Sequence, residues 1–168
     1  MRDADKAQAL TDWVEAYQKT LLNLCCMILK DYALAEDAVQ ETFIKAYRSC
    51  ESFRGQCSIK TWLTKIAVNT CRDMKKSSWF LHVNRSFSPI ILPDTPSSSD
   101  DTLDLADAML KLSDRHRVVV LLYYDQEMTM QEIADVLGLS LSAVSKRLKK
   151  ALEKLQVLLR EEDADETH

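Results

Sequence analysis

The 168 residues of this chain suffice for one domain or two small ones, and their composition excludes several classes of protein. Gly and Pro are scarce, with two and three residues, and helical periodicity runs through the sequence, so we predict an all-α fold. No apolar run approaches the roughly 18 residues of a membrane span, and the first ten residues are polar and charged. We therefore expect a cytoplasmic protein with no direct membrane insertion.

The net charge of −4 is unevenly distributed along the chain. Residues 1–81 carry 12 Lys and Arg against 10 Asp and Glu, and residues 140–154 carry five basic residues against one acidic residue. A local positive potential acts on phosphates within a Debye length of roughly 8–10 Å. The acidic balance of the whole chain therefore does not exclude binding to nucleic acid.

The five cysteines form no C-x-x-C pair and no zinc spacing with the three histidines. They are Cys25, Cys26, Cys50, Cys57 and Cys71. We expect buried thiols in a reducing compartment, and a redox pair of Cys50 and Cys57 is the alternative.

Two amphipathic helices are predicted first, over residues 10–29 and 34–49, with a break at Asp31 and Tyr32. The second has an apolar set at Ala35, Ala38, Val39, Phe43, Ala46 and Tyr47. Its first turns carry Glu36, Asp37, Gln40 and Glu41. The helix dipole accounts for the first two acids, but not for the continuation of the patch. An acidic and amide patch suits docking to a basic partner surface.

A loop over residues 51–58 is predicted next, and a third helix over residues 59–76. Phe53 in the loop is either an anchor packed on the core or a stacking platform for an unpaired base. On the helix, a basic arc lies beside the apolar face and is bordered by Trp62 and Asn69. The arc consists of Lys60, Lys65, Arg72, Lys75 and Lys76. It is either a surface that tracks phosphates or a solvated face beside a core tryptophan.

A Pro-, Ser- and Asp-rich linker over residues 82–101 separates a domain at residues 1–81 from a second one at residues 102–162. The second domain opens with a helix from about Leu103, and Ser113 then caps another helix that runs to about Tyr124. Residues 163–168 form an acidic tail. No catalytic constellation, metal site or cofactor loop stands out, so we predict neither an enzyme nor a cofactor.

Residues 129–155 read as two short helices joined by a tight turn. Thr129 and Glu132 form a capping box, Gly138 ends the first helix, and Ser140 caps the second. The second helix is basic on one face, which predicts a helix-turn-helix that enters the DNA major groove. The alternative is a helical hairpin with a solvated charged face.

The order of these parts resembles an extracytoplasmic-function (ECF, group 4) sigma factor of the bacterial sigma-70 family. The family's region 2.2 resembles LAEDAVQETFIKAY, and its regions 2.3 and 2.4 resemble SFRGQCSIKTWLTKIAVNTCRD. Its region 4 resembles the piece from Leu112 to Leu155, with an EIA…LG…S..V..R core. The AED..Q..F motif followed by F-R-G and W-L..I-A-x-N at this spacing is a specific signature.

The resemblance implies partners and a role for each group of residues. Core RNA polymerase would be bound through its β′ clamp helices, with the β flap as a further contact, by Glu36, Asp37, Gln40, Glu41 and Phe43. Melted −10 DNA would be bound by Ser52, Phe53, Arg54, Lys60, Trp62, Lys65, Asn69 and Arg72. Duplex −35 DNA would be bound by Ser142, Ser145, Lys146, Arg147, Lys149 and Lys150, with Arg147 on the DNA backbone or in local packing.

Two departures from the family's pattern leave the −35 sequence open. Lys149 and Lys150 replace an arginine-rich pattern, and Lys lacks the bidentate fork, so phosphate contact and guanine reading are both open there. Ser145 stands where many members have a basic residue. The leading hypothesis is a promoter-specificity subunit controlled by an anti-sigma factor. The alternatives are a stand-alone helix-turn-helix regulator and an adaptor that occupies a partner without transcribing.

Overall fold

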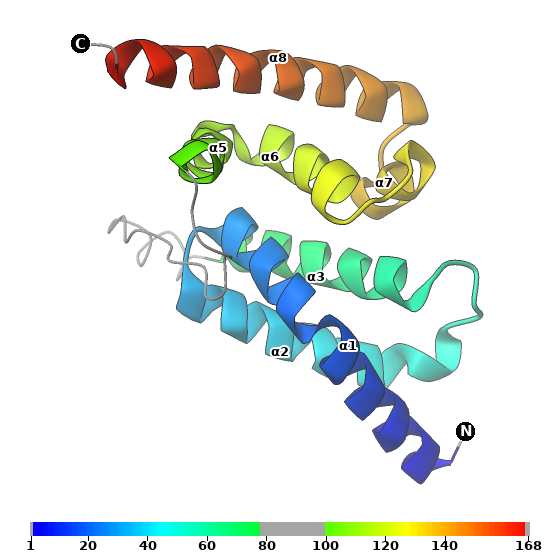
Figure 1. The fold of residues 1–168 in the computed structure, drawn as a ribbon. Coiled ribbons are helices and arrows are strands. Elements are labelled where there is room, and N and C mark those ends of the chain that lie inside the picture. The colour runs from blue at the N-terminus through cyan, green and yellow to red at the C-terminus, as the bar shows by residue number, and fades with distance from the viewer. Residues whose placement is uncertain (1, 78–99, 167–168) are drawn as a thin grey trace. The chain divides into compact units, whose positions relative to one another are not determined.

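The computed structural model describes residues 2–77 and 100–166, and these form seven α-helices (Figure 1). The prediction of an all-α fold is confirmed. The chain divides into two compact units, Met1–Leu92 and Pro93–His168. Residues 82–99 of the predicted linker lie outside the described residues, whereas residues 100 and 101 already belong to a helix.

The first unit is built from α1 (Asp3–Leu29), α2 (Tyr32–Ser49) and α3 (Ile59–Lys76), which all pack on one another. Its core is apolar and includes Leu21, Leu24, Ala35, Ala38, Leu63 and Ala67. The break predicted before the second helix has a clear cause. Lys30 adopts a left-handed conformation, and the Asp31 carboxylate accepts a hydrogen bond of 2.8 Å from the N–H group of Leu34.

The N-terminal helix begins seven residues before the predicted position. Its first two turns are mostly exposed and carry no large apolar side chain, so they contain no apolar periodicity from which a helix could be predicted. They are instead favoured by Asp3 and Asp5, because acids near a helix N-terminus complement its dipole. These extra turns extend toward the end of the unit where α2 connects to α3 (Figure 1).

The second unit consists of α5 (Asp100–Lys111), α6 (Asp114–Val120), a π-helical turn η2 (Leu121–Asp125), α7 (Met130–Leu137) and α8 (Leu141–Glu166). Helix α8 packs on α5, α6 and α7. It continues through most of the predicted acidic tail. As predicted, a helix begins after Ser113, but the Ser113 hydroxyl makes no capping bond to the backbone. It lies 2.9 Å from Nδ1 of His116 instead.

The junction between α5 and α6 is organised around Arg117, whose side chain is fully buried. Its Nε donates to the carbonyl oxygen of Met109 at 2.9 Å, and its Nη2 donates to that of Leu112 at 2.6 Å. Its Nη1 pairs with the Asp114 carboxylate at 3.1 Å. These bonds join carbonyl groups at and just after the C-terminal end of α5, where the Met109 carbonyl oxygen also accepts the N–H of Leu112 at 3.3 Å. The periodicity of the sequence gives no indication of this role.

Candidate partner and nucleic-acid interfaces

The residues of the acidic patch predicted on α2 lie on the surface of the first unit, except for one. Glu36, Asp37 and Gln40 are exposed, and Glu41 is half-buried. Phe43, the fifth residue expected at this interface, is only 7% exposed and belongs to the core. Its side chain therefore packs inside the first unit and offers little surface to a partner.

Two apolar side chains on α2 continue this patch and were not among the predicted site residues. Ile44 is 44% exposed, and Tyr47, which was expected on the apolar core face, is 36% exposed. Asp37, Gln40, Ile44 and Tyr47 recur at helical spacings of three and four, so they form one stripe. That spacing is the signal from which the stripe could have been found. A stripe that joins a carboxylate, an amide and two apolar side chains is typical of a protein interface.

The α2 patch is connected to α3 through Lys45. Its ammonium group donates a hydrogen bond of 3.2 Å to the hydroxyl of Thr70 and lies 4.0 Å from the Asp73 carboxylate. It also lies 3.9 Å from the Glu41 carboxylate, one turn earlier on α2. Glu41 is therefore partly neutralised within the unit, and the exposed acid at the centre of the patch is Asp37.

The α2–α3 connection begins with a 3-10 turn, η1 (Cys50–Ser52), and not with an irregular loop. The Ser52 hydroxyl donates to the Ser49 carbonyl oxygen at 2.7 Å, so this predicted DNA contact has a local partner in the free chain. Phe53 is half-buried, and its ring lies 4.7 Å from that of Trp62, centroid to centroid. Arg54 is exposed.

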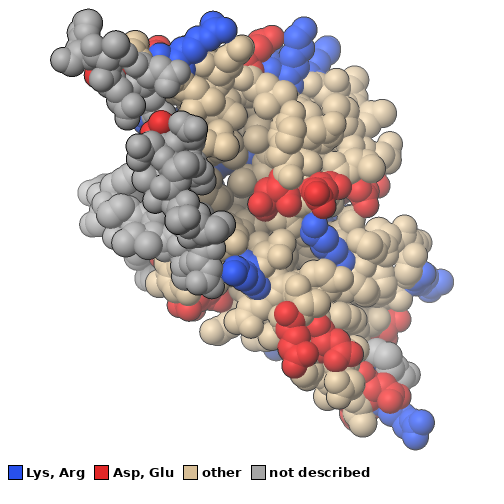
Figure 2. Space-filling model, viewed as in Figure 1, with Lys and Arg blue, Asp and Glu red and all other residues tan. Residues whose placement is uncertain are grey.

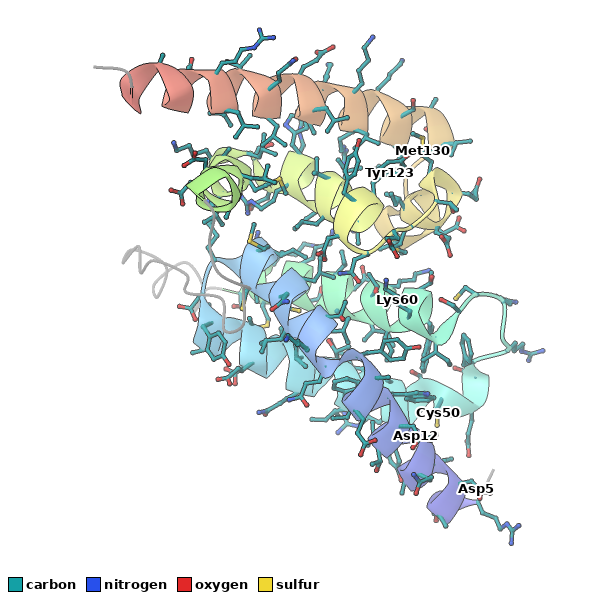
Figure 3. All side chains as sticks on the ribbon, viewed as in Figure 1. Asp5, Asp12, Cys50, Lys60, Tyr123 and Met130 are labelled. Atoms are coloured by element: carbon teal, nitrogen blue, oxygen red, sulfur yellow. The ribbon has the colours of Figure 1, made fainter. Side chains whose placement is uncertain are left out.

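The predicted basic arc on α3 starts where this loop is anchored. Trp62, Lys65, Asn69 and Arg72 recur at spacings of three and four, and Lys65 and Asn69 are exposed. Trp62 and Arg72 are half-buried, as is Lys60, which is labelled in Figure 3. The stripe and the base of the loop therefore meet at Trp62, through Phe53. A row of cationic and polar side chains beside aromatic rings is a combination that suits single-stranded nucleic acid.

The predicted caps and turn glycine of the helix-turn-helix are confirmed. Thr129 and Glu132 form the capping box, with the Thr129 N–H donating to the glutamate at 2.9 Å. Gly138 adopts φ 65°, and the Ser140 hydroxyl accepts the N–H of Ala143 at 3.2 Å. Helix α7 packs on the start of α8.

The residues predicted to meet duplex DNA lie at the start of α8 and are mostly exposed. Ser142, Ser145, Lys146, Lys149 and Lys150 are exposed, whereas Arg147 is half-buried. In Figure 2, Lys and Arg side chains project from the edge of α8 that faces away from α6. The partial burial of Arg147 distinguishes this residue from its exposed neighbours. It is compatible with the expected place of Arg147 in DNA backbone contact or local packing.

A buried histidine lies beneath the basic surface of α8. It was not among the predicted site residues. His116 on α6 is 3% exposed, and its ring contacts the Ser113 hydroxyl. Burial lowers the pKa of His116, and the nearby charges of Lys154, Arg115 and Arg147 lower it further. His116 is therefore neutral at neutral pH.

Four of the five thiols are buried, as predicted, whereas Cys57 is exposed because it lies in the α2–α3 loop. A hydrogen bond with the Cys71 thiol raises the pKa of Cys25, and burial raises the pKa of Cys26 to about 11. Cys25 and Cys26 are therefore protonated at neutral pH, which lowers their reactivity. Within residues 2–77 and 100–166, no three Cys, His, Asp or Glu side chains form a group that could hold a metal ion.

None of the helices in the described part of the chain combines the length and apolar character required to cross a bilayer.

Residues 13–80 match the family model for Sigma-70 region 2, and residues 108–157 match the one for Sigma-70, region 4. The chain is 30% identical over 168 residues to the ECF RNA polymerase sigma factor SigW of Bacillus subtilis, covering 91% of this chain and 90% of that protein. It is 32% identical over 166 residues to the RNA polymerase sigma factor YlaC of the same species, covering 92% and 96%.

Two solved structures share the fold along most of its length. One is the sigma factor RpoE in complex with the anti-sigma factor NepR from Bartonella quintana, with a TM-score of 0.73, 25% identity, and coverage of 93% of this chain and 97% of that one. The other is CnrH in complex with the cytosolic domain of CnrY, with a TM-score of 0.68, 26% identity, and coverage of 95% and 90%. This chain therefore belongs to the ECF sigma factors of the sigma-70 family, a family without enzymatic activity of its own.

Proposed function

We propose that this sigma factor acts in the cytoplasm by binding core RNA polymerase and directing it to promoters, with the first unit reading melted −10 DNA and the second reading duplex −35 DNA. The observation that carries this proposal is the exposure of two chemically opposite surfaces. An acidic and apolar stripe runs along α2, in the segment that matches region 2, and a basic face lies on α8, in the segment that matches region 4.

For core docking, we propose the stripe of Asp37, Gln40, Ile44 and Tyr47, with Glu36 and Glu41 beside it. The β′ clamp helices are the partner expected from the family. Glu41 already lies near Lys45, so Asp37 is the acid most available to a basic partner surface. On docking, Ile44 and Tyr47 would bury apolar surface against the partner and so supply affinity. The acids would orient the partner as it approaches.

For promoter contact, the two DNA states require different chemistry. A duplex −35 element offers base edges in the major groove, which the exposed side chains at the start of α8 can reach. A melted −10 element offers unstacked bases and backbone phosphates, which suit the loop at Arg54 and the stripe from Trp62 to Arg72. The two units would thus read two elements at once when polymerase holds both in register.

The test is a pair of charge reversals in reconstituted holoenzyme. Asp37→Arg places a like charge against a basic partner and is expected to weaken core binding by more than about tenfold, while leaving the helical content unchanged. Glu15→Arg reverses an exposed acid on α1 and is the matched control, with core affinity expected to stay the same. Retention of full affinity by Asp37→Arg would remove the docking assignment.

Promoter reading is tested by transcription of fragmented genomic DNA with core polymerase and the purified chain. Initiation from a set of sites that share two elements at fixed spacing is the expected result. Initiation at no specific site would contradict the proposed function. A tight gel shift by the chain alone on a palindromic site would favour the stand-alone regulator instead.

An anti-sigma factor is also proposed as a partner. The structural relatives RpoE and CnrH are each described in complex with a second protein, an anti-sigma factor in the case of RpoE. The exposed stripe on α2 and the basic face of α8 are the surfaces that such a regulator would have to mask. Competition between the regulator and core polymerase for the chain is the corresponding measurement.

A further inference from the structure

The loop that follows α2 is held at its base by the N-terminal half of α1. None of the predicted site residues lies in this half of α1. Glu51 in η1 forms an ion pair with Lys6 on α1. The Lys6 side chain is only 17% exposed, although it lies in the polar first turns of the helix. Figure 3 shows Asp5 and Asp12 on this part of α1, with Cys50 at the start of η1 close by.

A second contact between α1 and the loop passes through three aromatic rings. The indole of Trp13 on α1 meets that of Trp62 on α3 edge to face, with ring centroids 5.6 Å apart. Phe53 packs on Trp62 with ring centroids 4.7 Å apart. Both geometries are favourable for aromatic pairs. The chain of Trp13, Trp62 and Phe53 therefore links α1 to the loop.

Beyond these two contacts the loop projects into solvent. Residues 54–57 are all exposed, and Gly55 adopts a left-handed conformation with φ 70°. The hydrogen bonds at the base of the loop are local, such as that from the Phe53 N–H to the Cys50 carbonyl oxygen at 3.3 Å. The orientation of the exposed tip therefore depends on how Glu51 and Phe53 are held.

We propose that Lys6 and Trp13 are positioning residues for −10 recognition, which fix Glu51 and Phe53 and so present Arg54 to DNA in one orientation. In this arrangement Phe53 is the anchor of the loop. A loop ordered before binding loses less conformational entropy on contact with DNA, so it binds more tightly. The inference rests on the proposed function, because it concerns the −10 contact assigned there.

Lys6 and Glu51 both carry their charges at physiological pH, which supports this arrangement. The hydrogen bond between them raises the pKa of Lys6 and lowers the pKa of Glu51, so both remain ionised at neutral pH. Because the pair is partly solvated, its effect on loop order is expected to be modest, about two- to fivefold in an equilibrium.

Loop order is tested directly on the free full-length chain with an arginine-specific protease, by following cleavage after Arg54. Lys6→Gln and Trp13→Leu are each expected to raise the cleavage rate by about two- to fivefold or more. The charge swap of Lys6→Glu with Glu51→Lys is expected to return the rate toward that of the parent chain. Gln8→Ala is the control, because Gln8 is exposed and bonds to Asp12 within α1, at 2.9 Å.

The functional consequence is tested in holoenzyme on fork-junction DNA, whose −10 strand is taken from a promoter that the parent chain transcribes. Lys6→Gln is expected to lower the preference for the correct −10 strand by about two- to fivefold, with affinity for core polymerase and for the −35 duplex unchanged. A merely structural role would instead change all three quantities together.

Unchanged cleavage together with unchanged −10 preference in both Lys6→Gln and Trp13→Leu would overturn the inference. A parent holoenzyme that shows no preference for any −10 strand would overturn the proposed function itself, whatever the cleavage rates are. Because Lys6 lies outside the apolar core, in the first turns of α1, Lys6→Gln tests the inference even if Trp13→Leu does not fold.

Discussion

The guanidinium group of Arg117 donates a hydrogen bond of 2.6 Å to the carbonyl oxygen of Leu112, with the arginine side chain completely buried. The same group bonds the Met109 carbonyl oxygen from the preceding turn. A charged side chain is retained in this core because it closes the end of α5 and fixes the corner from which α6 begins. Replacement by an apolar residue would remove this donor from the buried Leu112 carbonyl group and would leave the Met109 carbonyl group with the N–H of Leu112 alone, at 3.3 Å.

Arg117→Met is expected to destabilise the second unit by about 1–3 kcal/mol, since a buried carbonyl group left unpaired costs roughly that amount. Urea unfolding of the full chain measures the change. Arg115→Met, two residues away and exposed, is the matched control and is expected to change stability by less than about 0.5 kcal/mol. Similar stabilities for the two variants would show that Arg117 does not hold this corner.

Two buried threonines in the first unit are expected to respond in opposite directions to the same substitution. The Thr64 hydroxyl is buried and has no hydrogen-bond partner within the described residues, whereas the Thr42 hydroxyl donates to the Ala38 carbonyl oxygen at 2.6 Å. Thr64→Val is expected to stabilise the chain by about 1 kcal/mol, and Thr42→Val to destabilise it by about 1 kcal/mol. Thermal unfolding measures both, and a loss of stability in Thr64→Val would contradict this account.

Stability of the second unit is expected to fall as pH decreases, because the pKa of His116 is lowered in the folded state. The folded chain then binds fewer protons than the unfolded chain, so stability is full above the unfolded pKa of about 6.5 and is lost as pH falls below it. Urea midpoints at about pH 7.5 and about pH 5.5 measure the effect. Glu51 does not interfere, because its lowered pKa places its titration in more acidic solution.

His116→Gln is expected to reduce this pH dependence relative to the parent chain. The comparison isolates His116 from His82 and His168, which are present in both proteins and lie outside the described residues. Identical slopes for the two proteins would show that His116 retains an ordinary pKa in the fold.

The two interpretations left open for Lys149 predict different results. If its exposed ammonium group contacts phosphate, Lys149→Gln will weaken holoenzyme binding to all −35 sequences alike and reduce the salt dependence of binding by about one unit of slope. If it reads guanine, the variant will relax sequence preference at one position. We expect the phosphate result, because Lys lacks the bidentate fork. Arg160→Gln, exposed further along α8, is the control.

Helices whose ends carry their own capping residues could be predicted from the amino-acid sequence alone. Residues 59–76 form a helix with the predicted bounds, because Ser58 caps its start. The capping box at Thr129 and the left-handed Gly138 were likewise predictable, since a cap depends on residues within three positions of each other. The same local patterns supported the family resemblance.

Which side chains lie on the surface and which lie in the interior depends on the packing of the helices. Phe43 is buried and Tyr47 is exposed, although both lie on the side of α2 that periodicity predicts to be apolar. The contacts of Lys6 with Glu51 and of Trp13 with Trp62 join residues about 45 and 49 positions apart, and a partner at such a distance leaves no periodic trace in the sequence. Local propensity fixes where a helix begins and ends, but the faces that meet depend on how α1, α2 and α3 pack together.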